Sequence, residues 1–184
     1  MRPEEVILVN DADEEIGCME KMEAHVKAVL HRAFSVFLFN SEGEMLLQRR
    51  AMSKYHSGGL WTNACCSHPR PGETTESAAS RRTKEELGIE PRLNKAFSFT
   101  YRAAFENGLT EYEFDHVFVG HHDGNLYPNP EEVSDTCYLS MEHIRQDLQE
   151  QPAKYTEWFK IAFQQVVDHM RLADWRITGL VNSQ

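Results

Sequence analysis

A cysteine and a histidine stand two residues apart in the segment WTNACCSHP, which runs from position 61 to position 69. The thiol of Cys66 acts as a nucleophile or a base only as a thiolate, and a nearby cation or metal ion favours that form. The glycines and prolines of residues 53–73 predict loops, and loops on a rigid scaffold often carry catalytic groups. The alternative is a small buried cysteine beside His68 as a turn residue, and these residues leave both interpretations open.

Two carboxylates flank a tyrosine in Glu111-Tyr112-Glu113, at the start of an expected strand. Residues two apart in a strand project to the same face, so both carboxylates point toward one place. Apolar residues follow directly, which places the two acids at the border of the apolar part of the sheet. Buried like charges require a compensating cation, whereas a solvated strand face would require none.

Histidines supply a third group of candidates. His25 and His31 flank the approach to a strongly β-forming stretch, but six-residue spacing is not the i, i+4 pattern of a metal-binding helix. The chain has nine histidines, so pairs in turns such as His121 and His122 are expected to be bystanders. Three imidazoles with one or two carboxylates nevertheless suit a divalent ion of manganese, zinc or iron.

Residues 67–89 resemble the Nudix box, G-x5-E-x7-R-E-U-x-E-E-x-G-U, in which U is a bulky aliphatic residue. The matching positions are Glu73, Arg81, Glu85, Glu86, Gly88 and Ile89. The box has a glycine, a glutamate and an aliphatic residue where this chain has Ser67, Arg82 and Thr83. In the Nudix family the helix glutamates hold divalent metals on a diphosphate, so an arginine in place of one glutamate argues against hydrolysis. An ordinary helix with a surface pair between Arg82 and Glu86 is the alternative.

These groups need strands to position them, and the hydrophobic pattern predicts several. Strands are expected at residues 6–9, 33–39, 45–50, 97–105 and 112–120. Residues 17–25 are expected to supply the hairpin partner of the first strand. The last two strands are joined by Glu106-Asn107-Gly108, in which Asn-Gly favours a tight hairpin turn.

Three helices are predicted around these strands. The first is capped by Thr74 or Thr75 and ends at Gly88, the second covers residues 141–149 with Ser140 as its cap, and the third covers residues 156–172. The third repeats apolar residues at helical spacing and is expected to pack in the core. Without an internal repeat or a composition shift, we expect a single domain over residues 1–184 with its core at about residues 30–172.

Composition narrows the class of protein. The chain has 184 residues, of which 41% are hydrophobic and 26% charged, and this fits one globular domain rather than a disordered chain, a collagen or a coiled coil. The net charge of -10 argues against binding to nucleic acid or an anionic membrane, so an anionic ligand needs local cations. Four unevenly spaced cysteines and the lack of a long apolar run indicate a cytoplasmic protein without a membrane segment.

Short motifs along most of the chain are similar to those of the type 1 isopentenyl-diphosphate isomerases, a family of the Nudix superfamily. The motifs are His25, Leu30-His31-Arg32-Ala33-Phe34-Ser35, Gln48-Arg49-Arg50-Ala51, Trp61-Thr62-Asn63, Cys66-Ser67-His68-Pro69, Glu86-Leu87-Gly88, Tyr101-Arg102-Ala103 and Glu111-Tyr112-Glu113. The resemblance implies an α/β (α+β) fold of mixed β-sheets flanked by helices. It also implies interconversion of isopentenyl and dimethylallyl diphosphate.

The resemblance further implies a role for each candidate residue. The metal centre, for Mn²⁺ or Zn²⁺, would consist of His25, His31, His68, Glu111 and Glu113. Cys66 and Glu113 would be the catalytic pair, with Tyr101 beside the acid. Mg²⁺ on the diphosphate would be held by Glu86 and the main-chain oxygen of Cys66. The substrate would be bound by Lys21, Arg50, Lys54, Arg82 and, over the hydrocarbon, Trp158.

The implied reaction protonates the terminal alkene carbon and removes a proton from C2, by way of a tertiary carbocation that needs a dry pocket. The partner would be a small diphosphate, and the protein is expected to be a monomer. Two other functions remain as alternatives. One is a Nudix hydrolase acting on a nucleoside diphosphate derivative, and the other is a zinc-stabilised binding module that uses Cys66, His68, His25 and His31.

Overall fold

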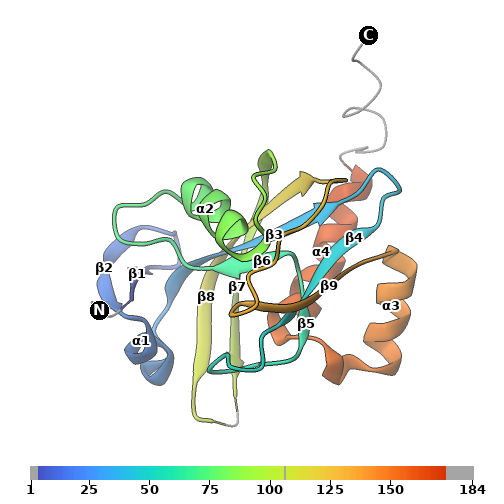
Figure 1. Ribbon diagram of the computed structural model, residues 1–184. Helices are drawn as coiled ribbons and strands as arrows, with labels where there is room; N and C mark the ends of the chain where they lie inside the picture. The colour runs from blue at the N-terminus through green and yellow to red at the C-terminus, as the bar shows by residue number, and fades with distance from the viewer. Residues whose placement is uncertain (1–3, 106, 173–184) are drawn as a thin grey trace.

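The computed structural model describes residues 4–105 and 107–172, which form a curled nine-stranded mixed sheet with helices on both faces (Figure 1). The strands are β1 (Glu5–Val9), β2 (Glu15–Glu20), β3 (His31–Phe39), β4 (Met45–Arg50), β5 (Trp61–Thr62), β6 (Cys65–Ser67), β7 (Leu93–Ala104), β8 (Thr110–His121) and β9 (Val133–Leu139). The helices are α1 (Lys21–Lys27), α2 (Thr75–Leu87), α3 (Met141–Glu150), the 3-10 helix Pro152–Lys154 and α4 (Glu157–Leu172). Within the described ranges, no helix has the length and apolar character needed to cross a membrane.

Strand β3 lies at the centre of the sheet. It runs antiparallel to β1, β4 and β6 and parallel to β8. The parallel register sets His31 beside Glu113, and the antiparallel register sets Cys66 beside Ser35. Residues that are neighbours across two strands project to the same face. The sheet therefore brings residues from three distant parts of the chain to one of its faces.

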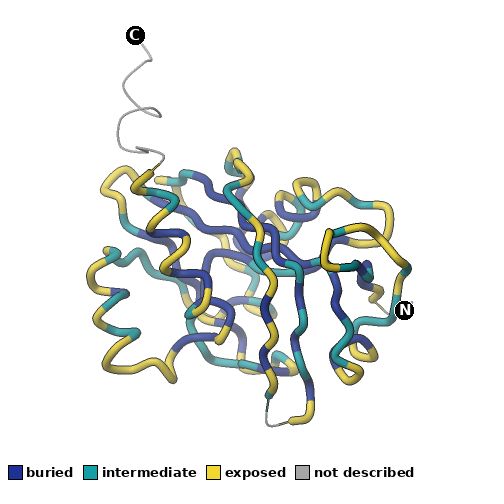
Figure 2. Tube along the Cα trace, turned by 180° about the vertical axis from the view of Figure 1, so that it is seen from behind, coloured by how far each residue is buried: buried dark blue, intermediate teal, exposed yellow. Residues whose placement is uncertain are grey.

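Two hydrophobic cores lie on opposite faces of the sheet, and β3 contributes to both. Its residues Phe34, Val36 and Leu38 belong to the core beneath α2. Phe37 and Phe39 belong to the other core, which α4 covers. Successive side chains of a strand point to opposite faces, so the unbroken apolar run of β3 suits a strand that is covered on both sides. Figure 2 shows the buried strands in the middle of the molecule and the exposed positions on helices and turns.

The predicted helix ends are confirmed. The Thr74 hydroxyl accepts a hydrogen bond from the amide of Ser77 at 3.2 Å, and α2 ends at Gly88, which has a φ of +69°. A Cβ at Gly88 would lie 2.7 Å from the Cβ of Tyr127, so both backbone conformation and space favour glycine there. The Ser140 hydroxyl caps α3 by accepting a hydrogen bond from the amide of His143.

The expected hairpin partner at residues 17–25 is only half correct. Strand β2 ends at Glu20, and the next residue begins helix α1. The Glu20 carboxylate accepts hydrogen bonds from the amides of Met22 and Glu23 at 3.0 and 2.8 Å. This side chain satisfies amides that a helix leaves free at its first turn, so it stops the strand and starts the helix.

Three strands were not predicted. Strand β9 lies in a segment to which no strand was assigned, and it pairs antiparallel with β4. Strands β5 and β6 are two and three residues long and lie within the predicted loop of residues 53–73, so Cys66 sits on a short strand rather than on a loop. In the predicted turn between β7 and β8, Gly108 has a φ of +81°, and Glu106 lies outside the described residues.

Candidate active site

A cavity at one end of the α4 face brings most of the candidate residues together. It is lined by side chains from α1, α2, α4, the central strands and the loop after β4. The predicted site residues that line it are Lys21, Arg50, Lys54, Cys66, His68, Arg82, Glu86, Tyr101, Glu111, Glu113 and Trp158. The remaining two, His25 and His31, are completely buried beside it.

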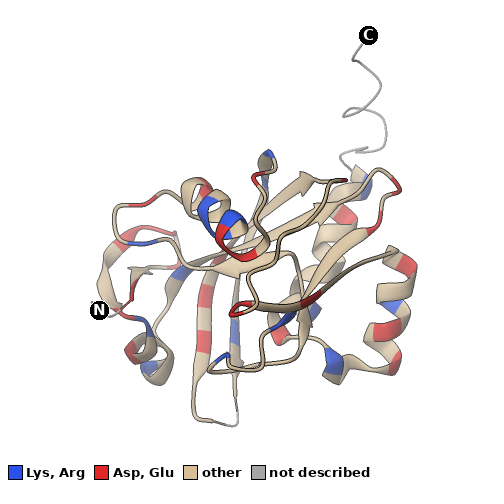
Figure 3. Cartoon of the chain, in the orientation of Figure 1, with Lys and Arg blue, Asp and Glu red and all other residues tan. Residues whose placement is uncertain are grey.

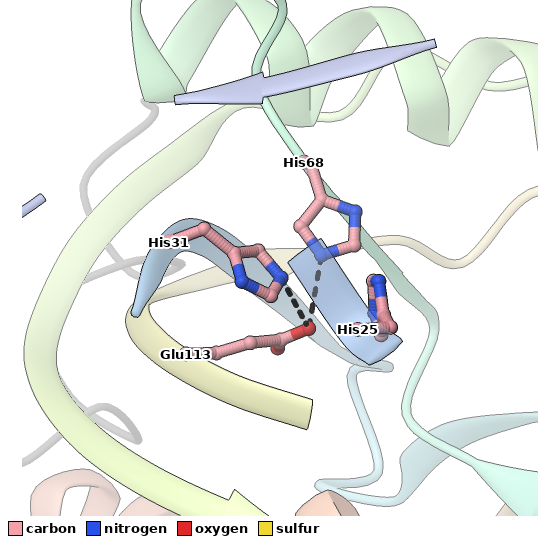
Figure 4. Close-up of side chains that lie close together, drawn as sticks. All are labelled: His25, His31, His68 and Glu113. Carbon is pink, nitrogen blue, oxygen red and sulfur yellow. Dashed lines mark hydrogen bonds and ion pairs between the residues drawn. The ribbon is translucent and has the colours of Figure 1, made fainter. Parts of the chain in front are cut away.

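Four side chains form a compact cluster in Figure 4. The ligand atoms of His25, His31, His68 and Glu113 all lie within 4.8 Å of one another. Glu113 Oε1 lies 2.9 Å from His68 Nε2 and 3.5 Å from His31 Nε2. These residues come from α1, β3, the segment after β6 and β8, so only the folded chain can bring them together.

The backbone fixes the orientation of two of these imidazoles. His25 Nδ1 lies 2.6 Å from the carbonyl oxygen of Lys21, and His31 Nδ1 lies 2.8 Å from that of Val29. A carbonyl oxygen only accepts, so Nδ1 carries a proton, and in the neutral ring Nε2 keeps its lone pair. Both Nε2 atoms are buried without a hydrogen-bond partner. Imidazoles held in this way beside a carboxylate fit a divalent metal ion.

Glu111 stands apart from this four-residue cluster, although the resemblance includes it among the ligands. It forms a second group with His25 and His56, again with ligand atoms within 4.8 Å of one another. The Tyr101 hydroxyl connects the two carboxylates, because it donates to Glu113 Oε2 at 2.7 Å and lies 3.0 Å from Glu111 Oε2.

The two glutamates differ in charge state. Burial raises the pKa of Glu111 well above its ordinary value, and the negative charge of Glu113 adds to the effect. Burial acts in the same direction on Glu113, but the imidazoles of His68 and His31 outweigh it and hold its pKa well below the ordinary value. Glu113 is therefore the ionised member of the pair at neutral pH.

The two adjacent cysteines point to opposite faces of the sheet. Cys65 is paired with Val36 and belongs to the core beneath α2. Cys66 is paired with Ser35, packs on the α4 side and lines the cavity. Burial raises the pKa of Cys66 to about 12, although the positive charge of Arg50 acts to lower it. Cys66 is therefore a neutral thiol at neutral pH, a point that the sequence left open.

Four basic side chains in the cavity wall offset the acidic character of the chain. Lys21 contacts Glu4 at 3.1 Å, Lys54 forms an ion pair with Glu132, and Arg82 lies between Glu86 and Glu132 at 2.6 and 3.4 Å. Arg50 is buried, and its guanidinium contacts the carbonyl oxygen of His56 at 3.4 Å. Figure 3 shows basic and acidic positions mixed along α2, where Arg82 and Glu86 lie.

The pair between Arg82 and Glu86 is real but is not the surface pair that helix spacing alone suggested. Glu86 is buried, and its other oxygen accepts a hydrogen bond from Gln48 Nε2 at 2.9 Å. Glu85, the next residue of the box, points outward with a side chain that is 39% exposed and pairs with Arg81 and Arg82. Only one of the two adjacent glutamates is therefore directed into the cavity.

Trp158 lines the cavity as expected, but a cation already lies over its ring. The guanidinium carbon of Arg50 is 5.2 Å from the ring centroid. This contact stabilises a buried cation that otherwise has few partners, because Arg50 Nε has no hydrogen-bond partner among the described residues. The indole therefore positions the Arg50 guanidinium in addition to lining the cavity.

The sequence interpretation missed His56, Tyr55 and Glu132. His56 and Tyr55 lie in the loop after β4, where no hydrophobic period marks a residue as buried. Burial lowers the pKa of His56 to about 3, so its ring is neutral. Glu132 lies just before strand β9, which was not predicted. The only available signal was residue type, and nine histidines and many glutamates make that signal weak.

The chain is similar in sequence to known proteins over most of its length. The NUDIX domain matches residues 29–159. The chain is 48% identical over 164 residues to Isopentenyl-diphosphate Delta-isomerase 2 of Aromatoleum aromaticum, a match that covers 89% of this chain and 87% of that protein. It is 49% identical over 165 residues to the Isopentenyl-diphosphate Delta-isomerase of Pectobacterium atrosepticum, over 90% of this chain and 92% of the relative.

Solved structures show the same architecture at low sequence identity. A protein of Deinococcus radiodurans matches with a TM-score of 0.74 at 23% identity, over 88% of this chain and 98% of that protein. A MutT protein of Methanosarcina mazei Go1 matches with a TM-score of 0.63 at 19% identity, over 76% and 94% of the two chains. These likenesses confirm the fold that the motif pattern implied, with a mixed sheet between helices.

Proposed function

The chain belongs to the isopentenyl-diphosphate Delta-isomerases, a family with the NUDIX domain, and we propose that the cavity described above carries out their reaction. The protein interconverts isopentenyl diphosphate and dimethylallyl diphosphate. The observation that carries the assignment to this cavity is that Cys66 and Glu113 both line it, together with four basic side chains. A proton donor, a proton acceptor and a site for a diphosphate thus share one cavity.

Cys66 and Glu113 are the proposed proton-transfer pair. With a neutral thiol and an ionised carboxylate before substrate binds, one group can donate a proton while the other accepts one, so the pair starts in complementary states. One group acts at the terminal alkene carbon and the other at C2, and their roles exchange in the reverse reaction. Tyr101 hydrogen-bonds both carboxylates and keeps them aimed into the cavity.

The proposed metal centre consists of His25, His31, His68 and Glu113, with Glu111 as the next carboxylate. A bound Mn²⁺ or Zn²⁺ would supply positive charge that stabilises the Glu113 carboxylate. Glu86 would hold a Mg²⁺ that neutralises the diphosphate, together with the main-chain oxygen of Cys66. The support for these assignments is the buried, unpartnered imidazole nitrogens and the position of Glu86 in the cavity wall.

The proposed diphosphate site is formed by Lys21, Arg50, Lys54 and Arg82. Their charges act at short range, where the screened field of a protein with a net charge of -10 counts for little. The hydrocarbon would lie beside Trp158, which is buried in the cavity wall. Exclusion of water protects a carbocation from capture, and the indole adds a modest attraction for positive charge.

The two alternatives explain fewer of these contacts. A nucleotide hydrolase needs the box glutamate that Arg82 replaces and has no use for the buried thiol of Cys66. A zinc-stabilised binding module leaves the basic side chains and Glu86 without a role. We also propose that the protein acts in the cytoplasm as a monomer, with one domain over residues 1–184.

Incubation with isopentenyl diphosphate and Mg²⁺ in D₂O, followed by NMR of the product, tests this function. We expect dimethylallyl diphosphate that carries deuterium in the methyl group derived from the terminal alkene carbon, because the acid's proton exchanges with solvent. The variant Cys66→Ala is the control and should give almost no product. Unlabelled product would exclude the protonation mechanism, and release of phosphate from nucleotides would favour a hydrolase.

A further inference from the structure

His56 is enclosed by aromatic side chains at the edge of the cavity. It lies in the loop between β4 and β5, and its side chain is only 3% exposed. The ring stacks on Phe105 at a centroid distance of 4.7 Å and meets the edges of Tyr55 and Trp158 at 4.3 and 5.9 Å. These contacts hold the imidazole in one orientation, with Nε2 directed toward Glu111.

The contact between His56 and Glu111 does not have the geometry of a hydrogen bond. His56 Nε2 lies 3.1 Å from Glu111 Oε1, yet this nitrogen has no hydrogen-bond partner among the described residues. Two ligands at right angles around an ion, each bound at about 2.1 Å, lie about 3.0 Å apart. The observed separation fits a pair of neighbouring metal ligands better than a donor and an acceptor.

The other ring nitrogen of His56 also has a polar neighbour. Nδ1 lies 3.2 Å from the hydroxyl oxygen of Ser57, which can accept its proton. This leaves the Nε2 lone pair free, the arrangement that carbonyl oxygens impose on His25 and His31. All three histidines therefore present a buried, unpartnered Nε2 beside a carboxylate.

A third donor completes the group. The ligand atoms of His25, His56 and Glu111 lie within 4.8 Å of one another, and His25 also belongs to the cluster with His31, His68 and Glu113. Because the Nδ1 of His25 is bound to a carbonyl oxygen, this residue has a single nitrogen for a metal and can serve only one ion at a time. The two groups of ligands therefore adjoin each other and share His25.

We propose that His56 is a further ligand of the divalent metal ion, bound together with His25 and Glu111. This inference rests on the proposed metal centre and extends it by a histidine that the motif pattern did not include. It adds a fourth imidazole to the candidate ligands, and it assigns Glu111 a neighbouring ligand.

His116 provides a matched comparison. It is also a buried histidine, and its Nε2 lies 2.9 Å from Asp13 Oδ2 without a hydrogen-bond partner. No group of three or more potential ligands among the described residues contains His116. The two sites differ in the third donor, which is the feature that indicates metal binding at His56.

The test is pulsed electron paramagnetic resonance of the full chain loaded with one equivalent of Mn²⁺. The variants His56→Phe, which keeps the aromatic stack, and His56→Gln, which keeps polarity, should each lose the nitrogen coupling of one bound imidazole. Both should also bind Mn²⁺ at least about tenfold more weakly in competition with a chelator. His116→Gln should leave the nitrogen couplings and the affinity unchanged.

Unchanged nitrogen couplings in both His56 variants would overturn the proposal, whatever their activity. Failure of the metal centre itself would look different, because the wild-type protein would then show no imidazole couplings at all. Failure of the proposed function would appear in the isomerisation assay of the wild type. The three outcomes are thus separated by measurements on three samples.

Discussion

The two faces of the sheet use neighbouring residues for opposite purposes. On the α2 face, Cys65 and Phe118 are fully buried in an apolar core. On the α4 face, Cys66 and Glu113, from the same two strands, line the cavity. A strand alternates its side chains, so one residue step separates packing from chemistry. Two residues that are adjacent in the sequence can therefore have different roles. The face of the sheet to which a side chain points indicates its role better.

The α4 face is itself divided. Toward one end it is as apolar as the α2 face, with Phe37, Val117 and Val119 beneath α4. Toward the other end it carries buried histidines and glutamates whose charges compensate one another. Burial of so many ionisable groups costs stability, and a folded protein tolerates it where a ligand or metal ion completes the pairing.

Removal of divalent ions should have the largest effect, because the proposed metal sites lie in the cavity and the reaction is expected to depend on both. We expect treatment with a chelator followed by gel filtration to abolish isomerisation. Mn²⁺ or Zn²⁺ should restore the activity only when Mg²⁺ is also present, since the proposed centre and Glu86 hold separate ions. The measurement is the isomerisation rate alongside metal content. Full activity in a metal-free sample would contradict both metal assignments.

The adjacent cysteines give the sharpest contrast between the faces. Cys66→Ala should lose about 10² to 10⁴ or more in kcat, the usual contribution of a general acid or base. Cys65→Ala should lose little, because its side chain only fills space beneath α2. The measurement is kcat, with circular dichroism and metal content to show that each variant is intact.

Cys66→Ser refines the same test. A hydroxyl is a much weaker acid than a thiol, so this variant should also be severely impaired while it keeps the size and polarity of the site. Similar rates for Cys66→Ala and Cys65→Ala, in folded and metal-loaded samples, would remove Cys66 from the mechanism.

A core substitution on the α2 face should lower stability and leave kcat almost unchanged, the reverse of the effect expected for Cys66→Ala. Phe118→Ala removes a fully buried aromatic ring and should lower the free energy of unfolding by about 3 to 5 kcal/mol. At a temperature where the variant stays folded, its kcat should be close to that of the wild type. Urea denaturation and steady-state kinetics measure the two quantities. A large loss of kcat in the folded variant would show that the faces are coupled.

The smallest expected effect is a pH dependence at His116, which lies on the same strand as Glu113 but has no ligand group. Burial outweighs the attraction of Asp13 and lowers the pKa of His116 below its ordinary value of 6.5. The unfolded chain therefore binds more protons just below pH 6.5, and stability falls as the pH falls through that range. His116→Gln should reduce this slope in urea titrations between pH 7 and pH 5. If the free energy of unfolding of His116→Gln changed with pH as steeply as that of the wild type, the lowered pKa of His116 would be contradicted.

Residue patterns predicted much of the fold. The alternation and apolar runs of β3 and β4 are unambiguous, and Thr74 and Gly88 mark the ends of α2 by their side-chain chemistry. Strand β9 was missed because it is only partly buried and contains polar residues such as Ser134 and Asp135. Its strand conformation depends on pairing with β4, which is a property of the fold and not of the segment.

The sequence named most of the residues that the structure brings to the cavity, but it did not predict their contacts. The motifs placed Cys66 and Glu113 in one active site, and the structure places both in the same cavity wall. The separation of Glu111 from the four-residue cluster and the position of Arg50 over Trp158 were not foreseeable. Both depend on distances of a few ångströms between segments that no local pattern relates.

The parallel register that sets His31 beside Glu113 also determines when the proposed metal centre can form during folding. A chain emerging from the ribosome has exposed four histidines before residue 113 is synthesised, and it must still close a long loop to align the two strands. Contacts between such distant segments form late in folding. Binding of an ion at the proposed centre would therefore come late in folding, and it would distinguish fully folded chains from partly folded ones.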